Sequence, residues 1–498
     1  MAYFTTNLVG LVLPDLYIAE MSPPRRVAGI GTGVVAVIGE FEKGPVDEAI
    51  TIGSLAQLVD MFGGPGPDAN GNVYKGYTAL MNKGWQDLRV IRVSNTSQAK
   101  ATVTLISSDA SPNNLIKLDA RDVGYYGNKI KAEVSTGTVS GRKLTITNER
   151  GQKAVYDNVD ISTTALLNDL VAKINKGEMV TATALQAGTL KLQNYTFTGG
   201  SDGSFQLGDY TGSLAQERGL RVIERVDEVN LVFFAEMGPA TTAEQVQILN
   251  VALDDHCTLM SNRMAITCGL ADDTLSVAKT NVGISASDRL VYVYPYLKTF
   301  DADTNEVKLV APNSFVAAKI AALSPHVSPS NKELGGVIGV AKQLTRAELI
   351  DLTNYGIMPI SYVQGGGFRI RNGRTTEVID TARWQVFRRR MTDYIQVALA
   401  RSLYWAVSEP HTKELRRQIR QAIVDFLAEL EALGLIGDPN GELPAFVVVC
   451  DKSNNPAAVV AAGKLYCDVR VRLIAAADFI IIRTEIGEGV ITNQQVAA

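Results

Sequence analysis

From about residue 210 onward, short apolar runs alternate with longer segments of helical periodicity, and this alternation most constrains the fold. The expected strands are 229–234, 263–268, 290–294 and 357–362, and the expected helices between them are 243–260 and 345–354. Strands that alternate with helices favour a mainly parallel sheet covered by helices on both faces. The sequence therefore predicts an α/β core.

The same alternation of strand and helix patterns occupies the first hundred residues. Apolar residues 33–39 predict a buried strand, and Ser54 is a suitable N-cap for a short helix over 55–62. A further helix is expected near 74–82 and a strand at 88–93. Between 98 and 204 alternating strands dominate, at 102–106, 129–134, 143–147 and 190–197. This pattern predicts a β-rich domain inserted into the α/β core at a surface loop.

The last third of the chain changes again. Long helices are expected at 384–407 and 412–433, the second with one apolar stripe and with Gly434 as its stop. Strands are expected at 446–450 and 467–473. An α+β domain over 366–478 is therefore predicted.

Both ends of the chain are extended and apolar, with no hairpin partner beside them in sequence. Lone strands of this kind favour pairing with other copies of the chain. The residues expected to pair between subunits are Leu11, Leu13, Leu16, Tyr17 and Ile18 at one end and Phe479, Ile480, Ile481, Ile482 and Ile486 at the other. A self-assembling structural protein is the first hypothesis.

Composition excludes several other classes of protein. With 46% apolar and 20% charged residues, the 498-residue chain is expected to be globular and multidomain. A net charge of -4 gives no general attraction to nucleic acid or anionic membrane. The four cysteines contain no CxxC pair, so no metal site or cofactor is predicted, and buried free thiols are expected. No apolar run is long enough to span a bilayer, and no secretory signal is recognised.

One motif in the sequence suggests an enzyme as the alternative to a structural protein. Residues 199–203 (GGSDG) match the nucleophile elbow G-x-S-x-G, and Asp255 and His256 follow in the chain order of an α/β-hydrolase triad. A cytoplasmic hydrolase using Ser201 and His256 is the alternative. The elbow requires a helix directly after the serine, whereas residues 204–210 predict a loop, so a glycine-rich turn and no catalytic role is the preferred interpretation.

Positive charge gathers in one region. Residues 366–420 hold 12 lysines and arginines and 5 acids, a local balance of +7 in a chain that is -4 overall. A solvated helix face and a docking surface for an acidic partner remain open as interpretations. The candidate docking residues are Arg388, Arg389, Arg390, Arg416, Arg417 and Arg420.

Taken in order, these segments resemble the tail sheath proteins of contractile phage tails and related contractile injection systems. The N-terminal segments that carry the resemblance are 17–20 (YIAE), 33–39 (GVVAVIG), 43–46 (KGPV), 54–58 (SLAQL) and 62–64 (FGG). Those further on are 124–130 (GYYGNKI), 199–203, 292–296 (YVYPY), 310–314 (VAPNS), 344–349 (LTRAEL), 352–357 (LTNYGI), 426–430 (FLAEL) and 446–451 (FVVVCD). Residues 372–376 (NGRTT), Ala311 and Met358 depart from the family pattern.

The resemblance implies an α/β and α+β multidomain fold. It implies an N-terminal arm (1–20), a subtilisin-like, non-catalytic α/β core (21–97 with 205–365), an outward-facing insert (98–204), a tube-facing α+β domain (366–478) and a C-terminal arm (479–498). It also implies six-subunit rings stacked helically around an inner tail tube, with both arms adding strands to other copies. The implied partners are further copies, the tube protein, and baseplate and tail terminator proteins, in a virion assembled in the host bacterial cytoplasm. Nucleic acid and membrane insertion are not implied, and the protein is not expected to be an enzyme.

Overall fold

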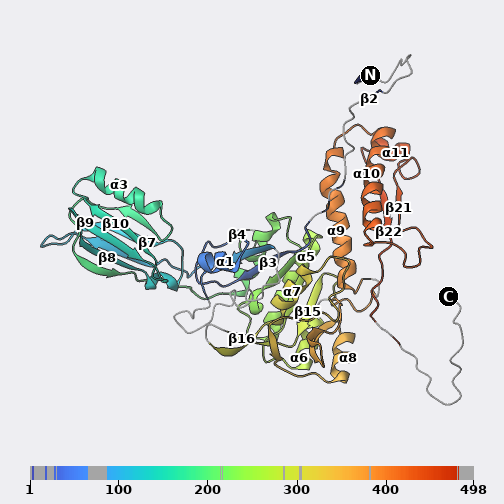
Figure 1. The fold of residues 1–498 in the computed structure, drawn as a ribbon, viewed down its shortest axis with the longest axis horizontal. Coiled ribbons are helices and arrows are strands. Elements are labelled where there is room, and N and C mark those ends of the chain that lie inside the picture. Colours follow the sequence, from blue (N-terminus) through green and yellow to red (C-terminus); the bar gives the residue numbers. More distant parts are fainter. Residues whose placement is uncertain are drawn as a thin grey trace. The chain divides into compact units, whose positions relative to one another are not determined.

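The computed structural model describes residues 3–4, 17–18, 27, 29, 31–64, 87–213, 215, 217–283, 286–301, 305–380, 383–478 and 481. These residues divide into two compact units (Figure 1). One unit is Ile30–Val397, and the other joins Met1–Gly29 with Ala398–Ala498. The two units are described separately below.

The larger unit is built on an eight-stranded sheet. Its strand order is β20-β19-β15-β14-β13-β3-β5-β4. The strands are β20 (Gly367–Ile370), β19 (Ile357–Val363), β15 (Leu290–Tyr294), β14 (Met264–Cys268), β13 (Leu231–Phe234), β3 (Val34–Gly39), β5 (Asp87–Arg92) and β4 (Ala49–Ile52). All neighbours from β19 to β5 pair in parallel, and the two edge strands pair antiparallel. The predicted mainly parallel sheet is confirmed.

Alternate residues of each strand point to opposite sides of this sheet, so both of its faces are apolar. Helices cover both faces. In β3, Val35 and Val37 join one hydrophobic cluster, while Ala36 and Ile38 join another. The first cluster includes side chains of α1 (Leu55–Phe62) and α7 (Pro312–Ala322). The second includes side chains of α4 (Leu207–Thr211), η2 (Gly219–Arg225), η3 (Ala235–Met237) and α5 (Ala243–Met260).

Smaller elements complete this part of the unit. A third cluster joins α6 (Leu275–Val282) and α8 (Arg346–Asn354) to β15. A separate antiparallel sheet has the order β17-β16-β18, from Glu306–Val310, Leu297–Asp301 and Val337–Val340. The boundary between the two compact units falls within α9 (Val386–Ser402). β20 pairs with β19 in the main sheet, although the sequence assigned this segment to the C-terminal domain.

The inserted region forms two antiparallel sheets around one core. The sheets have the orders β10-β9-β8-β12 and β11-β7-β6. The elements are β6 (Thr102–Ile106), β7 (Asn114–Ala120), η1 (Tyr125–Lys129), β8 (Lys131–Thr136), β9 (Arg142–Thr147), β10 (Lys153–Val159), α3 (Thr164–Asn175), β11 (Val180–Ala184) and β12 (Gln193–Thr196). Their shared core runs from Ala101 to Phe197 along the chain and includes Leu167, Leu170 and Ile174 of α3. The sequence missed α3 and three of these strands.

The smaller unit contains η4 (Tyr404–Ala406), α10 (Lys413–Ala432), β21 (Phe446–Val449), α11 (Ala457–Ala461) and β22 (Asp468–Val471). β21 and β22 pair antiparallel. β1 (Tyr3–Phe4) and β2 (Tyr17–Ile18) pair in parallel with each other. The helix expected at 74–82 lies outside the described residues.

Candidate assembly elements

The C-terminal helix α10 packs on a small, incomplete sheet. Leu415, Ile419, Ile423, Phe426 and Leu430 repeat at spacings of three and four, and all five are buried. α10 contacts β21, and the Nε of Arg420 donates a hydrogen bond to the carbonyl oxygen of Val448 at 3.2 Å. The helix thus supports the sheet, and its Arg420 already bonds one backbone carbonyl of β21.

The β21–β22 sheet has two strands in the part of the chain that the structure describes. Its register runs from Phe446 opposite Val471 to Val449 opposite Asp468. One extra bridge, between Ile436 and Leu473, extends it at one end. No third strand is hydrogen-bonded to it among the described residues. Open edges of this kind present backbone donors and acceptors that an added strand can satisfy.

Most of the predicted arm residues lie outside the described ranges. Leu11, Leu13 and Leu16 do so at one end, as do Phe479, Ile480, Ile482 and Ile486 at the other. Tyr17 and Ile18 form β2 and pair with Tyr3 and Phe4, so this segment has a strand partner within its own chain. Ile481 is 79% exposed and belongs to no helix or strand.

The three consecutive arginines at the start of α9 are not the exposed cluster that the sequence suggested. Arg390 is buried, and its guanidinium donates to the carbonyl oxygens of Thr32, Leu323 and Ser324 at 3.1, 3.0 and 3.5 Å. Burial lowers the pKa of Arg390 to about 10. An exposed docking role is therefore wrong for Arg390.

Arg389 is also engaged within the larger unit. Its guanidinium lies 2.7 Å from Oδ1 of Asp393 and 3.2 Å from Oδ2 of Asp288. Asp393 is itself buried and also pairs with Arg289 through two contacts of 3.2 Å. Burial raises the pKa of Asp393, and the two arginines oppose that rise. Arg388, beside them, is half-buried. Charge counting could not separate these internal pairs from a docking surface.

The arginines of α10 are more accessible. Arg417 and Arg420 are exposed, whereas Arg416 is buried. Arg417 pairs with Glu414, one turn earlier, through contacts of 2.6 and 3.0 Å. This pair lowers the pKa of Glu414, because the ionised carboxylate accepts hydrogen bonds from Arg417. Of the six predicted docking arginines, Arg417 and Arg420 remain available at a surface.

Ser201 and His256 do not have the geometry that the hydrolase alternative requires. Ser201 forms a bridge with Ala99, its Oγ accepts a hydrogen bond from the backbone of Gly203, and the next helix begins only at Leu207. His256 lies buried in α5, with its Nε2 3.4 Å from Arg263. Burial, and then the charges of Arg263 and Arg221, lower the pKa of His256 to about 3. Ser201 is not followed by the helix that an elbow requires, and the contacts described for Ser201 and His256 are with other residues, so the geometry does not support a triad.

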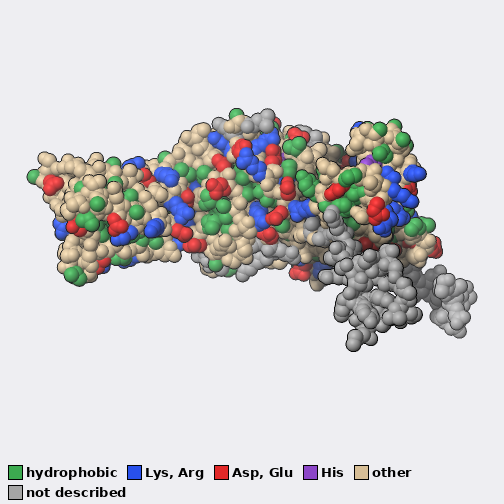
Figure 2. Space-filling model, turned by 90° about the horizontal axis from the view of Figure 1, so that it is seen from above, with side chains coloured by type: hydrophobic (Ala, Val, Ile, Leu, Met, Phe, Trp, Pro, Cys, Tyr) green, Lys and Arg blue, Asp and Glu red, His purple; other side chains and the backbone are tan. Residues whose placement is uncertain are grey.

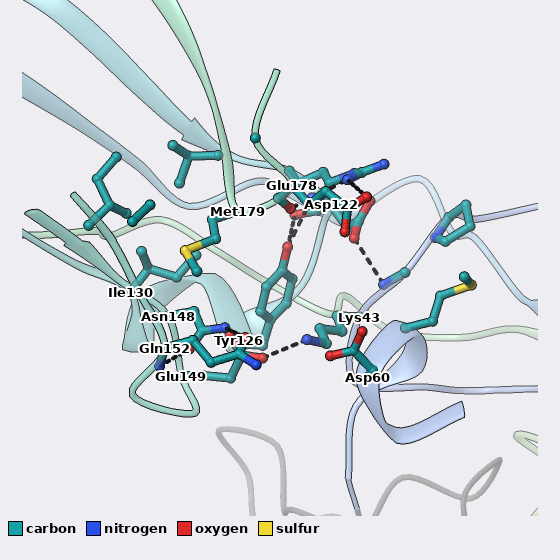
Figure 3. Close-up of a pocket in the computed structure, with 18 of the residues that line it drawn as sticks. Lys43, Asp60, Asp122, Tyr126, Ile130, Asn148, Glu149, Gln152, Glu178 and Met179 are labelled. Carbon is teal, nitrogen blue, oxygen red and sulfur yellow. Dashed lines mark hydrogen bonds and ion pairs between the residues drawn. The ribbon is translucent and has the colours of Figure 1, made fainter. Parts of the chain in front are cut away.

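The junction between core and insert is a densely bonded seam around a cavity of about 780 Å³ (Figure 3). Lys43 of the core pairs with Glu149 of the insert at 2.8 Å, and the Gly44 amide donates to Asp122 at 3.1 Å. The hydroxyl of Tyr126 accepts from the Asp122 amide at 2.9 Å. The first two contacts hold the insert against the core, and the third links Asp122 to Tyr126 within the insert.

Three further properties bear on function. Within the described ranges, no helix has both the length and the hydropathy needed to cross a membrane. The same residues contain no group of three or more histidines, cysteines or acids placed to hold a metal ion. Figure 2 shows positive and negative side chains interspersed over most of the visible face, which gives that face no broad field of one sign.

Several curated proteins match parts of this sequence, although no protein-family model matches it. A prophage major tail sheath protein of Pseudomonas aeruginosa is 25% identical over 220 residues, 42% of this chain and 54% of that protein. The tail sheath protein of Burkholderia phage BcepMu is 28% identical over 217 residues, 41% of this chain and 43% of that protein. The chain thus matches about half the length of these relatives, and their names confirm the resemblance drawn from the sequence.

Solved structures match nearly the whole chain. The sheath tail protein of Desulfitobacterium hafniense gives a TM-score of 0.64 at 14% identity, covering 88% of this chain and 93% of that one. The sheath tail protein of Listeria innocua gives 0.62 at 15% identity, covering 90% and 96%. The contracted helical sheath of the anti-feeding prophage gives 0.57 at 15% identity, covering 95% and 99%. The chain therefore has the mixed α/β fold of sheath proteins.

Proposed function

We propose that this protein is the structural subunit of a contractile tail sheath, and that it polymerises around an inner tail tube and contracts to drive that tube through a cell envelope. The observation that carries the proposal is the fold match to sheath proteins over at least 88% of the chain. The sequence relatives named as tail sheath proteins support it independently of structure. The protein would be a virion tail component, assembled in the host bacterial cytoplasm.

The proposed assembly is a stack of six-subunit rings. The core over 21–97 and 205–365 would be a subtilisin-like scaffold without catalysis, and the insert over 98–204 would face outward. The arms over 1–20 and 479–498 would each add a strand to the C-terminal domain of another copy. The open edges of the β21–β22 sheet support this role, because an incoming strand would satisfy their backbone groups.

Strand addition suits a sheath that moves. Backbone hydrogen bonds at the sheet edges would hold neighbouring copies together while the larger units rotate and slide between these anchors. Contraction would then be a concerted rigid-body rearrangement of subunits. The bonded seam between core and insert supports motion of those two parts as one body.

The proposed partners are further copies of this chain, the inner tube protein, and baseplate and tail terminator proteins. We place the tube contact in the C-terminal domain, and Arg417 and Arg420 of α10 are its candidate residues. Their exposure and their positive charge suit many weak contacts with an acidic tube surface, from which the sheath can later detach.

Electron microscopy of the purified full chain tests the proposal. We expect tubes or stacked rings at high protein concentration. Persistent monomers under all assembly conditions, together with labelling of Ser201 by a fluorophosphonate probe, would instead support the hydrolase alternative. A Ser201→Ala variant is the matched control for the probe, and we expect it to assemble as the wild type does.

A further inference from the structure

Two of the four cysteines face each other across the C-terminal sheet. The antiparallel register of β21 and β22 pairs Val448 with Val469 and Val449 with Asp468. Continued by one residue, that register sets Cys450 opposite Cys467. Directly opposed residues of antiparallel strands have Cα atoms about 4.5–5.5 Å apart, within the roughly 4.4–6.8 Å that disulfides span. The two side chains are close enough to hydrogen-bond to each other.

The surroundings favour ionisation of one of the two sulfurs. A hydrogen bond from Cys467 lowers the pKa of Cys450, and the charges of Arg416 and Arg420 act in the same direction, while burial opposes them. The same hydrogen bond, together with burial, raises the pKa of Cys467, which acts as the donor. A thiolate is the nucleophile of thiol–disulfide exchange, so Cys450 is the sulfur expected to attack first. Cys450 is 3% exposed and Cys467 is the more accessible of the two, so the oxidant reaches the pair from the side of Cys467.

The other two cysteines have a different environment. Cys257 lies in α5 and Cys268 in β14; both are fully buried in the same hydrophobic cluster, and burial raises the pKa of each thiol. Buried neutral thiols of this kind are inert. They therefore serve as internal controls for the pair in the smaller unit.

We propose that Cys450 and Cys467 are a disulfide-forming site, reduced in a reducing cytoplasm and oxidised by a low-molecular-weight disulfide once the protein meets an oxidising medium. The Cys450 thiolate attacks one sulfur of the oxidant and releases one thiolate, leaving a mixed disulfide. The Cys467 sulfur, after losing its proton, attacks Cys450 and releases the second thiolate. Two protein thiols are oxidised, one external disulfide is reduced to two thiols, and the electrons balance.

The bond would close the loop over 451–466 and covalently fix the register of β21 and β22. Because the two strands are short, such a link would prevent their separation. The site depends on the fold of this unit and not on the proposed sheath function, so it can be tested on the unassembled chain.

The experiment uses the reduced full-length protein and glutathione disulfide as the oxidant. After native incubation, free thiols are alkylated in denaturant, and the protein is digested with trypsin without reduction. Cleavage after Arg420, Lys452, Lys464 and Arg470 places the two cysteines in separate peptides, 421–452 and 465–470. We expect one cross-linked peptide pair that disappears on reduction, with Cys257 and Cys268 alkylated.

Two variants sharpen the result. A Cys467→Ser variant should lose the link and retain glutathione on Cys450, whereas a Cys257→Ser variant should keep the link unchanged. The proposal is overturned if the wild-type protein yields no 421–452 to 465–470 link. It is equally overturned if the link forms only between two chains, which mixing of isotopically light and heavy protein detects.

Discussion

The guanidinium of Arg92 donates a hydrogen bond from Nη2 to the carbonyl oxygen of Val123 at 2.9 Å and so joins the last residue of β5 to the insert. The same side chain donates to the carbonyl oxygens of Phe41 and Gly44 at 3.0 and 2.9 Å. Arg92 is 1% exposed. One buried cation thus organises both sides of the junction through which the chain enters the insert.

Arg92→Met should loosen this junction. Removal of the guanidinium leaves buried carbonyl groups without their donor, and we expect a loss of about 3 kcal/mol in the free energy of unfolding of the larger unit. Hydrogen exchange should rise in residues 94–101 and 198–204. The control is Arg121→Met, because the Arg121 side chain is 51% exposed. Equal exchange in both variants would contradict a central role for Arg92.

Arg390→Met should lower stability by about 2–3 kcal/mol, because three carbonyl oxygens lose a charged donor. Urea titration followed by tryptophan fluorescence measures the shift in midpoint. Arg417→Met is the matched control and should change the midpoint little, since solvent screens its exposed pair with Glu414. If both variants unfold at the wild-type midpoint, Arg390 does not act as a structural cation.

His256 should make the larger unit sensitive to acid. Its pKa is about 3 in the folded chain and 6.5 ordinarily, so the unfolded chain binds the extra proton between these values. This contribution to stability is fully present above pH 6.5 and is lost as the pH falls from 6.5 toward 3. We expect a loss of about 2 kcal/mol between pH 7.5 and pH 5. The pH dependence of urea midpoints for wild type and His256→Gln measures it, and parallel curves would contradict the assignment.

The sequence predicted elements with strong local signals. The helix over 243–260 has the predicted bounds, because Thr242 caps it and its apolar residues follow helical spacing. By contrast, α7 was missed. Nearly all of its residues are buried, including Asn313, which donates to the carbonyl oxygen of Phe234 at 2.8 Å. A helix buried on all sides has no polar face to reveal its period.

The candidate site was less predictable than the fold. A cluster of positive charge looks the same in sequence whether its arginines are solvated or face carbonyl groups of distant segments, as Arg390 does with Thr32. Its partners lie far apart in the chain, so only the tertiary structure reveals them. The cross-strand relation of Cys450 and Cys467 likewise depends on register, which spacing alone does not give.

Charge reversal on α10 should weaken tube binding selectively. In the double variant Arg417→Glu and Arg420→Glu, each lost contact should cost little by itself, but the losses add up around the ring. Co-sedimentation with the tube protein should fall more than sheath self-association, and the difference should shrink as salt rises. Lys413→Glu controls for charge at the helix start. Unchanged co-sedimentation at low salt would place the tube contact elsewhere.

A helical reconstruction of tubes assembled from the full chain tests strand exchange between subunits most directly. We expect six subunits per ring and, at each β21–β22 sheet, added strands contributed by the terminal arms of other copies. Deletion of residues 1–20 or of residues 479–498 should leave folded protein that forms no tubes. Tubes whose C-terminal sheets carry no strand from another copy, or normal tubes from either truncated chain, would contradict assembly by strand exchange.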